Sequence, residues 1–420
     1  MTEYTHIING KPAISPTTLS VQNPATQKKI GEVPVATKDQ LDEAVAAARA
    51  AFPAWSVKSQ DERAQVLEQI ADIVEKNIGE YKTILVSEQG KTLANAEWEL
   101  GGAVLFLRET AKLRLPEKVI VDNEQTRITE HHVPIGVCAG IVPWNFPLLI
   151  AILKIGAPLL AGNTLVLKPS PFTPLATLRL VKDIQAVVPP GVINILSGDD
   201  SLGPWITSHP GIDKNNGQAC IAAKRLYVHE KIYDQFRDEM AKFAKTVKIG
   251  DGADPQSQLG PVQNLMQYKK LLSFVDDAKA NGYKFITGGD VNPNPSNGLF
   301  MPVSFIDNPP EDSKIVREEP FGPIVPLLKW SDEADVIKRA NDTKLGLAAS
   351  VWGKDLEAAE RIAKQLQAGM IAVNGIGMST PHSAFGGHKE SGIGVEGGLN
   401  GLCGYSNIQT FALKKQVAFA

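Results

Sequence analysis

The stretch that decides the fold is GVCAGIVPWNFPLLIAILKIGAPLLAGNTLVLKPS, residues 136–170. Apolar runs at 137–142 and 164–167 predict two buried strands, and the longer apolar run at 148–160 between them predicts a helix. A further helix and a further strand are expected at 174–187 and 192–196. Strands that alternate with helices are typical of a doubly wound parallel sheet, whose ligands lie beyond the carboxyl ends of the strands. The sequence therefore predicts an α/β fold with a ligand site at that edge.

Candidate ligand-binding residues follow the first two of these strands directly. Pro143-Trp144-Asn145 comes after the first strand, and Lys168-Pro169-Ser170 comes after the second. An asparagine amide can donate a hydrogen bond to an oxyanion, although a plain turn asparagine is the alternative. Lys168 can bind a polar ligand, and a surface lysine is the alternative there.

A third candidate is Cys220, in the run Asn215-Asn216-Gly217-Gln218-Ala219-Cys220. A thiolate can attack a carbonyl carbon, and an amide can then hold the resulting oxyanion. The alternative is a buried structural cysteine, which is the usual state of a free cysteine. Cys138, in an apolar strand, and Cys403, near the carboxyl end, are expected to be structural.

Composition narrows the class of protein. The 420 residues are 43% hydrophobic and 21% charged, which is ordinary for a globular chain with room for two domains. The net charge is −3 and no basic block appears, so nucleic acid is not expected as a partner. The longest apolar stretch, 146–161, contains Lys154 and is too short to cross a membrane. The histidines show no metal-ligand spacing, and three cysteines without a secretory signal favour the cytoplasm.

The remaining segments carry readable patterns as well. Ser59 and Glu62 are spaced as a capping box that opens a helix through residue 78. Segments 118–122 and 126–133 flank a polar turn and predict a β-hairpin. Further helices are expected at 38–55, 81–89, 94–113, 202–208, 233–247, 266–281, 333–341 and 356–366. Further strands are expected at 226–229, 284–287, 324–328, 349–351, 371–373 and 407–413.

These landmarks, in this order, resemble the motifs of the aldehyde dehydrogenase superfamily, and the likeness covers nearly the whole chain. The matching segments are Pro143-Trp144-Asn145-Phe146-Pro147 (oxyanion), Lys168-Pro169-Ser170 (cofactor ribose), Gly217-Gln218-Ala219-Cys220 (nucleophile), Glu318-Glu319-Pro320-Phe321-Gly322-Pro323 (nicotinamide side) and Phe385-Gly386-Gly387-His388-Lys389-Glu390-Ser391-Gly392 (carboxyl-terminal signature).

The resemblance implies a role for each motif. Cys220 is the expected nucleophile, with the Asn145 amide and the Cys220 backbone N–H as oxyanion donors. Glu396 corresponds to a second acid that is proposed to relay protons, and a helix-surface glutamate is the alternative reading. The expected cofactor-binding residues are Pro143, Trp144, Lys168, Ser170, Glu319 at the nicotinamide ribose and Phe321 beside the nicotinamide ring.

The implied cofactor is NAD or NADP. Many members that prefer NAD have a glutamate at the position of Pro171, which reads the ribose hydroxyls. Without a carboxylate there to repel a 2′-phosphate, the choice between the two stays open. The implied substrate is a small aldehyde, and Trp98, Trp144 and Phe385 would suit an apolar one.

The sequence departs from the family pattern between Lys214 and Asn215. Several dozen residues are missing there, including a Phe-Thr-Gly-Ser turn at the cofactor pyrophosphate and a Glu-Leu-Gly-Gly motif that supplies the general base. Their loss implies an exposed sheet edge, lower stability and slow deacylation. The alternative function is a catalytically silent aldehyde dehydrogenase-like subunit or binding protein.

The resemblance also implies a division of the chain. Residues 1–113 and 135–214 would form a truncated cofactor-binding domain, and residues 215–396 a catalytic domain. Residues 114–134 and 397–420 would form a small β oligomerisation arm, which implies a homodimer or a homotetramer.

Overall fold

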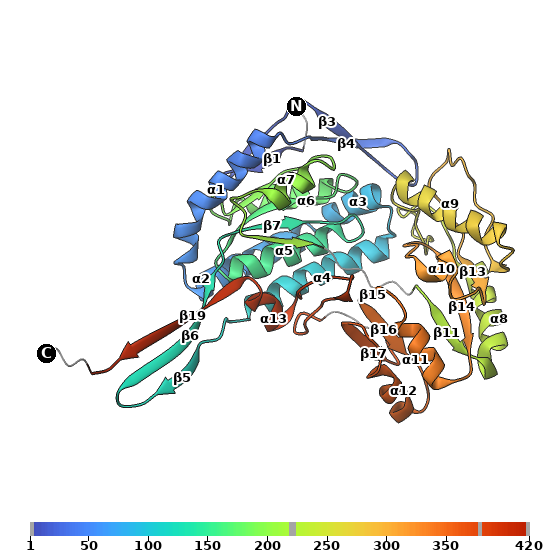
Figure 1. The fold of residues 1–420 in the computed structure, drawn as a ribbon. Helices are drawn as coiled ribbons and strands as arrows, with labels where there is room; N and C mark the ends of the chain where they lie inside the picture. Colours follow the sequence, from blue (N-terminus) through green and yellow to red (C-terminus); the bar gives the residue numbers. More distant parts are fainter. Residues whose placement is uncertain (1–3, 218–223, 377–379, 417–420) are drawn as a thin grey trace.

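The computed structural model describes residues 4–217, 224–376 and 380–416, which form two α/β units and a projecting β arm (Figure 1). The sheet of the first unit has the strand order β10-β7-β8-β9-β1-β2. Its strands are β1 (His6–Ile8), β2 (Lys11–Ala13), β7 (Val137–Ile141), β8 (Thr164–Lys168), β9 (Ile193–Ile195) and β10 (Lys214–Gly217). The neighbours β10, β7, β8 and β9 are parallel, so the predicted doubly wound sheet is confirmed.

Helices cover both faces of this sheet. On one face α1 (Lys38–Ser56) and α7 (Leu202–Ser208) pack on Val137, Ala139 and Val166. The other face carries the larger core, built with Cys138, Leu165 and Leu167. The helices of that face are α2 (Gln60–Lys76), α3 (Ile78–Gln89), α4 (Leu93–Ala111), α5 (Pro147–Leu160) and α6 (Leu175–Ile184). Because side chains of a buried parallel strand alternate between the two faces, neighbours such as Val137 and Cys138 enter different cores.

Local signals account for where these helices begin. Both halves of the predicted capping box are present, since Ser59 and Glu62 bond each other's backbone N–H at the start of α2. Thr37 and Gln40 form a second capping box at α1. The chain before α1 also contains β3 (Thr18–Gln22) and β4 (Lys29–Pro34), an antiparallel pair for which the sequence carried no prediction.

The second unit is built on a four-stranded sheet with the order β11-β14-β13-β12. Its strands are β11 (Leu226–His229), β12 (Phe285–Thr287), β13 (Ser304–Asp307) and β14 (Ile324–Trp330). Its helices are α8 (Glu230–Thr246), α9 (Leu265–Ala280) and α10 (Lys314–Arg317). Two small strand pairs complete this unit: β16 (Ala348–Val351) with β17 (Met370–Val373), and β15 (Leu345–Gly346) with β18 (His388–Lys389). Two further helices of this unit are α11 (Glu333–Asn341) and α12 (Leu356–Ala363).

The arm confirms the predicted hairpin and the predicted terminal strand. β5 (Lys118–Asp122) and β6 (Thr126–Pro134) form the hairpin, and β19 (Ser406–Lys414) pairs antiparallel with β6. Figure 1 shows the three strands extending away from both units. Their exposed apolar side chains are Val119, Ile120, Ile408, Phe411 and Leu413.

The two units touch where the candidate loops lie. Leu93 N–H donates to the Gly252 carbonyl at 3.2 Å, and Gln263 Nε2 donates to the Glu88 carbonyl at 3.1 Å. None of the helices within the described ranges has the length and apolarity needed to cross a bilayer.

Candidate active site

The segment that carries Asn145 joins β7 to α5 at the carboxyl end of the sheet. Val142 N–H donates to the Lys168 carbonyl at 2.9 Å, so this segment and the one after β8 leave the sheet side by side. Pro143, Trp144 and Asn145 are half-buried. The predicted placement of these residues at the carboxyl edge of the sheet is confirmed.

Lys168 and Ser170 are buried at the end of β8. Lys168 is only 5% exposed, so the alternative of a surface lysine is wrong. Burial lowers the pKa of Lys168, while Asp200 and Asp199 oppose that shift. The Lys168 Nζ makes a long bond of 3.4 Å to the Pro169 carbonyl. Since an ammonium has three donors, this group keeps the capacity to bind a polar ligand such as a ribose.

A ring contact joins the Asn145 segment to the second unit. The Trp144 and Phe321 rings meet edge to face, with centroids 5.2 Å apart and an interplanar angle of 78°. Phe321 has φ 55°, a left-handed conformation that side chains other than glycine rarely adopt. Gln267 Nε2 holds the turn by donating to the Pro320 carbonyl at 2.6 Å and to the Phe321 carbonyl at 3.1 Å. Glu319, in the same turn, is exposed.

Gln267 is a site-supporting residue that sequence reasoning missed. It lies in the first turn of α9 and is 8% exposed. A polar side chain on the apolar side of a predicted helix was the available signal. Its two bonds stabilise the strained Phe321 turn, and such strain concentrates at functional sites.

Glu396 lies outside any helix and forms an ion pair with Lys154. Its backbone exchanges two hydrogen bonds with Phe385, at 2.6 and 2.7 Å, so it belongs to an isolated β-bridge and the helix-surface reading is wrong. The Lys154 Nζ donates to Glu396 Oε1, and the two side chains are 1% and 13% exposed. Burial lowers the pKa of Lys154, and Glu396 opposes that shift. The sequence signal for Lys154 was a lone lysine inside the apolar run 148–160.

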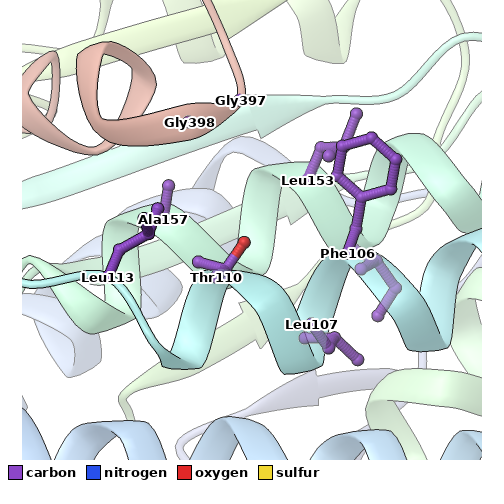
Figure 2. Close-up of a pocket in the computed structure, with 10 residues that line it drawn as sticks. Phe106, Leu107, Thr110, Leu113, Leu153, Ala157, Gly397 and Gly398 are labelled. Atoms are coloured by element: carbon purple, nitrogen blue, oxygen red, sulfur yellow. The ribbon is translucent and has the colours of Figure 1, made fainter. Parts of the chain in front are cut away.

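A small pocket lies beside this ion pair, between α4, α5 and the start of α13 (Gly398–Cys403) (Figure 2). Gly397 and Gly398 line this pocket together with Phe106, Leu107 and Leu153. Thr110 is the polar side chain of this lining. The residues that line this pocket include no titratable side chain.

Cys220 lies outside the described residues, but both of its flanks reach the candidate site. Gly217 pairs with Ile141, at the carboxyl end of β7. On the other side, the Lys224 Nζ is buried with no hydrogen-bond partner among the described atoms. Burial lowers the pKa of Lys224 to about 8, and the charge of Glu319 opposes that shift. The described residue before Cys220 therefore lies on the Asn145 side, and the described residue after it lies near Glu319.

The two described cysteines are structural, as expected. Cys138 is fully buried, and burial raises the pKa of its thiol to about 12. Burial also raises the pKa of Cys403. Neither thiol is poised as a thiolate near neutral pH. Within the described residues no three His, Cys, Asp or Glu side chains gather as a metal site would require.

Comparison with known proteins identifies the family. The model of the aldehyde dehydrogenase family matches residues 12–214 and 214–411, with its break at Lys214. The aldehyde dehydrogenase LUC3 of a Fusarium species is 36% identical over 469 residues, covering 99% of this chain and 99% of that protein. That alignment is longer than the 420 residues of this chain, so the relative has positions with no counterpart here.

Solved structures share the whole fold. The NAD+ complex of an aldehyde dehydrogenase from Bacillus cereus has a TM-score of 0.93 and 28% identity, covering 99% of this chain and 97% of that one. An NADP-dependent enzyme from E. coli has a TM-score of 0.93 and 30% identity, covering 98% of each chain. The chain therefore uses NAD or NADP as its cofactor and belongs to the aldehyde dehydrogenase family.

Proposed function

We propose that this protein oxidises an aldehyde to a carboxylic acid through a thioester on Cys220. The observation that carries the proposal is the contact between Trp144 and Phe321. It brings the oxyanion motif of the first unit against the nicotinamide-side motif of the second. Gly217, before Cys220, pairs with Ile141 just ahead of the first motif, and Lys224, after Cys220, interacts with the charge of Glu319 in the second.

NAD or NADP, when bound, accepts the hydride that the aldehyde loses. Lys168 and Ser170 would hold the adenosine side, because they are buried at the end of β8. Pro143 and Trp144 would line the cofactor path, Glu319 would bind the nicotinamide ribose, and Phe321 would pack beside the ring.

The protein groups act on the carbonyl. The Cys220 thiolate attacks the aldehyde carbon, and the Asn145 amide and the Cys220 N–H donate to the oxyanion. Loss of hydride from the same carbon leaves a thioester. Water then cleaves the thioester, which releases the acid and returns the thiol.

Glu396 is the candidate acceptor for protons of this cycle. It is 13% exposed and forms an ion pair with the buried ammonium of Lys154. General base catalysis contributes ~10²–10⁴-fold. The resemblance implies that the usual base motif is missing at the break after Lys214, so deacylation is expected to be slow.

Domains and assembly follow the family plan in this proposal. Residues 1–113 and 135–214 bind the cofactor, residues 215–396 carry out the chemistry, and residues 114–134 and 397–420 form the oligomerisation arm. Exposed Phe411 and Ile408 on β19 favour a homodimer or a homotetramer, since apolar arm surface gains from burial. The site of action is proposed to be the cytoplasm.

The second candidate function is a silent subunit of such an oligomer. The break in the family match at Lys214 favours it, because the resemblance implies that the missing segment would supply the base and part of the pyrophosphate site.

Mass spectrometry of the intact protein separates the two functions. After incubation with an aldehyde and cofactor, the enzyme should carry an acyl group on the Cys220 peptide, and the Cys220→Ala variant should carry none. A native protein that stays unmodified with every aldehyde tested, yet enters oligomers with a full-length relative, would favour the silent subunit.

A further inference from the structure

A buried ion pair between Lys91 and Glu99 lies behind the Asn145 segment. The two side chains are 7% and 0% exposed, and they flank the start of α4. Burying two charges carries a large desolvation cost, and apolar replacements are often as stable. Both side chains of the pair also form hydrogen bonds with the main chain of the Asn145 segment.

Lys91 contacts the site residue and its neighbour. Its Nζ donates to the main-chain carbonyl of Asn145 at 2.9 Å. The same Nζ lies 4.2 Å from the centroid of the Phe146 ring, which is a cation–π contact. One ammonium thus fixes the peptide after Asn145 and the ring that follows it.

Glu99 holds the other side of the same segment. Its Oε1 accepts from Leu148 N–H at 2.9 Å and from Leu149 N–H at 3.1 Å, in the first turn of α5. The residue before α5, Phe146, provides no side-chain cap, and Pro147 has no N–H. Glu99 therefore supplies a helix cap from a different helix, where a negative charge is favoured.

We propose that Lys91 and Glu99 are positioning residues that hold the Asn145 amide where the oxyanion forms. The ion pair locks the two charged groups to each other, and each group binds one end of the segment 145–149. The inference rests on the proposed function, in which Asn145 binds the oxyanion.

The test variant is Lys91→Met/Glu99→Gln. Glutamine keeps an oxygen for the two α5 N–H groups, methionine fills the space of the lysine stem, and no lone charge stays buried. The ammonium on the Asn145 carbonyl is lost. The matched control is Glu88→Gln, a fully buried carboxylate that caps α6 instead.

Two reactions of Cys220 with small reagents are compared. Acylation by p-nitrophenyl acetate passes through an oxyanion, and alkylation by iodoacetamide does not. The test variant should lose ~10–100-fold in acylation rate, as small misplacements of a catalytic group do, with alkylation unchanged. Glu88→Gln should leave both rates unchanged. Equal acylation in the test variant, or a parallel loss of both rates, would overturn the inference.

A double-mutant cycle with Asn145→Ala separates the inference from the proposed function. If Lys91 acts through Asn145, then Lys91→Met/Glu99→Gln should cost nothing further in the Asn145→Ala background. A full additional loss there would contradict the positioning role. An Asn145→Ala variant that acylates normally would instead contradict the proposed role of Asn145.

Hydrogen exchange gives a readout that needs no activity. In Lys91→Met/Glu99→Gln the amides of segment 144–150 should exchange faster and those of 173–178 should be unchanged, with the reverse in Glu88→Gln. Native exchange at 144–150 in the test variant would contradict the inference.

Discussion

The segments after β7 and β8 leave the same sheet edge, and in each the next helix takes its cap from a distant glutamate. Glu99 caps α5 behind Asn145, and Glu88 caps α6 behind Lys168. Glu88 accepts from Leu175 N–H at 2.7 Å and from Ala176 N–H at 3.0 Å. Neither helix has a side-chain cap from its own N-cap residue, Phe146 or Pro174.

The two glutamates differ in charge compensation. Glu99 has the Lys91 ammonium, whereas Glu88 has no ion-pair partner among the described residues. Burial, opposed by its two backbone bonds, raises the pKa of Glu88 to about 8. A distant glutamate thus caps both helices, with an ammonium partner at α5 and without one among the described residues at α6. The segment proposed for chemistry is held by charges, and the segment proposed for the cofactor is held by a group that can be protonated.

The largest expected effect is on stability. Glu99→Ala leaves the buried Lys91 ammonium without its carboxylate and two N–H groups without their acceptor, which should cost ~3–5 kcal/mol in the free energy of unfolding. Glu88→Ala leaves two N–H groups without an acceptor but leaves no buried charge without its ion-pair partner. It should cost ~1–3 kcal/mol in the free energy of unfolding. Urea titrations of both variants at neutral pH measure the difference, and equal losses would remove the distinction between the two caps.

The next largest effects are expected on acylation for the segment after β7 and on cofactor binding for the segment after β8. Asn145→Ala should slow acylation of Cys220 ~10²–10³-fold, the usual effect of losing one oxyanion donor. Ser170→Ala should weaken cofactor binding and leave the acylation rate at saturating cofactor unchanged, since it removes binding common to the ground and transition states. Single-turnover rates against cofactor concentration distinguish these outcomes. An unchanged rate in Asn145→Ala would contradict its assignment.

A further expected effect is a pH dependence of stability that comes from Glu88 and is ~1.4 kcal/mol for each pH unit. Its folded pKa of about 8 exceeds the ordinary 4.5, so the folded state holds the proton more tightly. The stability from this group is complete below pH 4.5 and is lost as the pH rises to about 8. Over that window the free energy of unfolding of the native protein should fall by ~1.4 kcal/mol per pH unit relative to that of Glu88→Gln. Parallel stability profiles for the two proteins would show that Glu88 stays ionised.

The sheet and the helices of the first unit could be predicted from local sequence patterns. The apolar run 148–160, the Ser59 capping box and the hairpin turn each act over a few residues, and each was confirmed. Strand β13 was missed because it is a short run, Ser304–Asp307, set between prolines at 302 and 309. Its place between β12 and β14 depends on neighbours distant in the chain.

Site motifs were visible in sequence, whereas their supports were not. Lys154 and Glu396 are 242 residues apart, and no local pattern pairs them. Lys91 lies 54 residues before the carbonyl that it binds. Tertiary packing determines which residues form such pairs. A lysine in an apolar run therefore indicates that a buried partner exists, but the sequence does not identify that partner.

The most direct test of the account is a stopped-flow record of reduced cofactor, with excess NAD or NADP and a panel of aldehydes. We expect a burst near one equivalent per Cys220 followed by slow turnover, because the proposed function keeps the acylating groups and lacks the family's usual deacylation base. The burst should be absent in Cys220→Ala. A folded native protein that forms no reduced cofactor with any aldehyde would contradict the account.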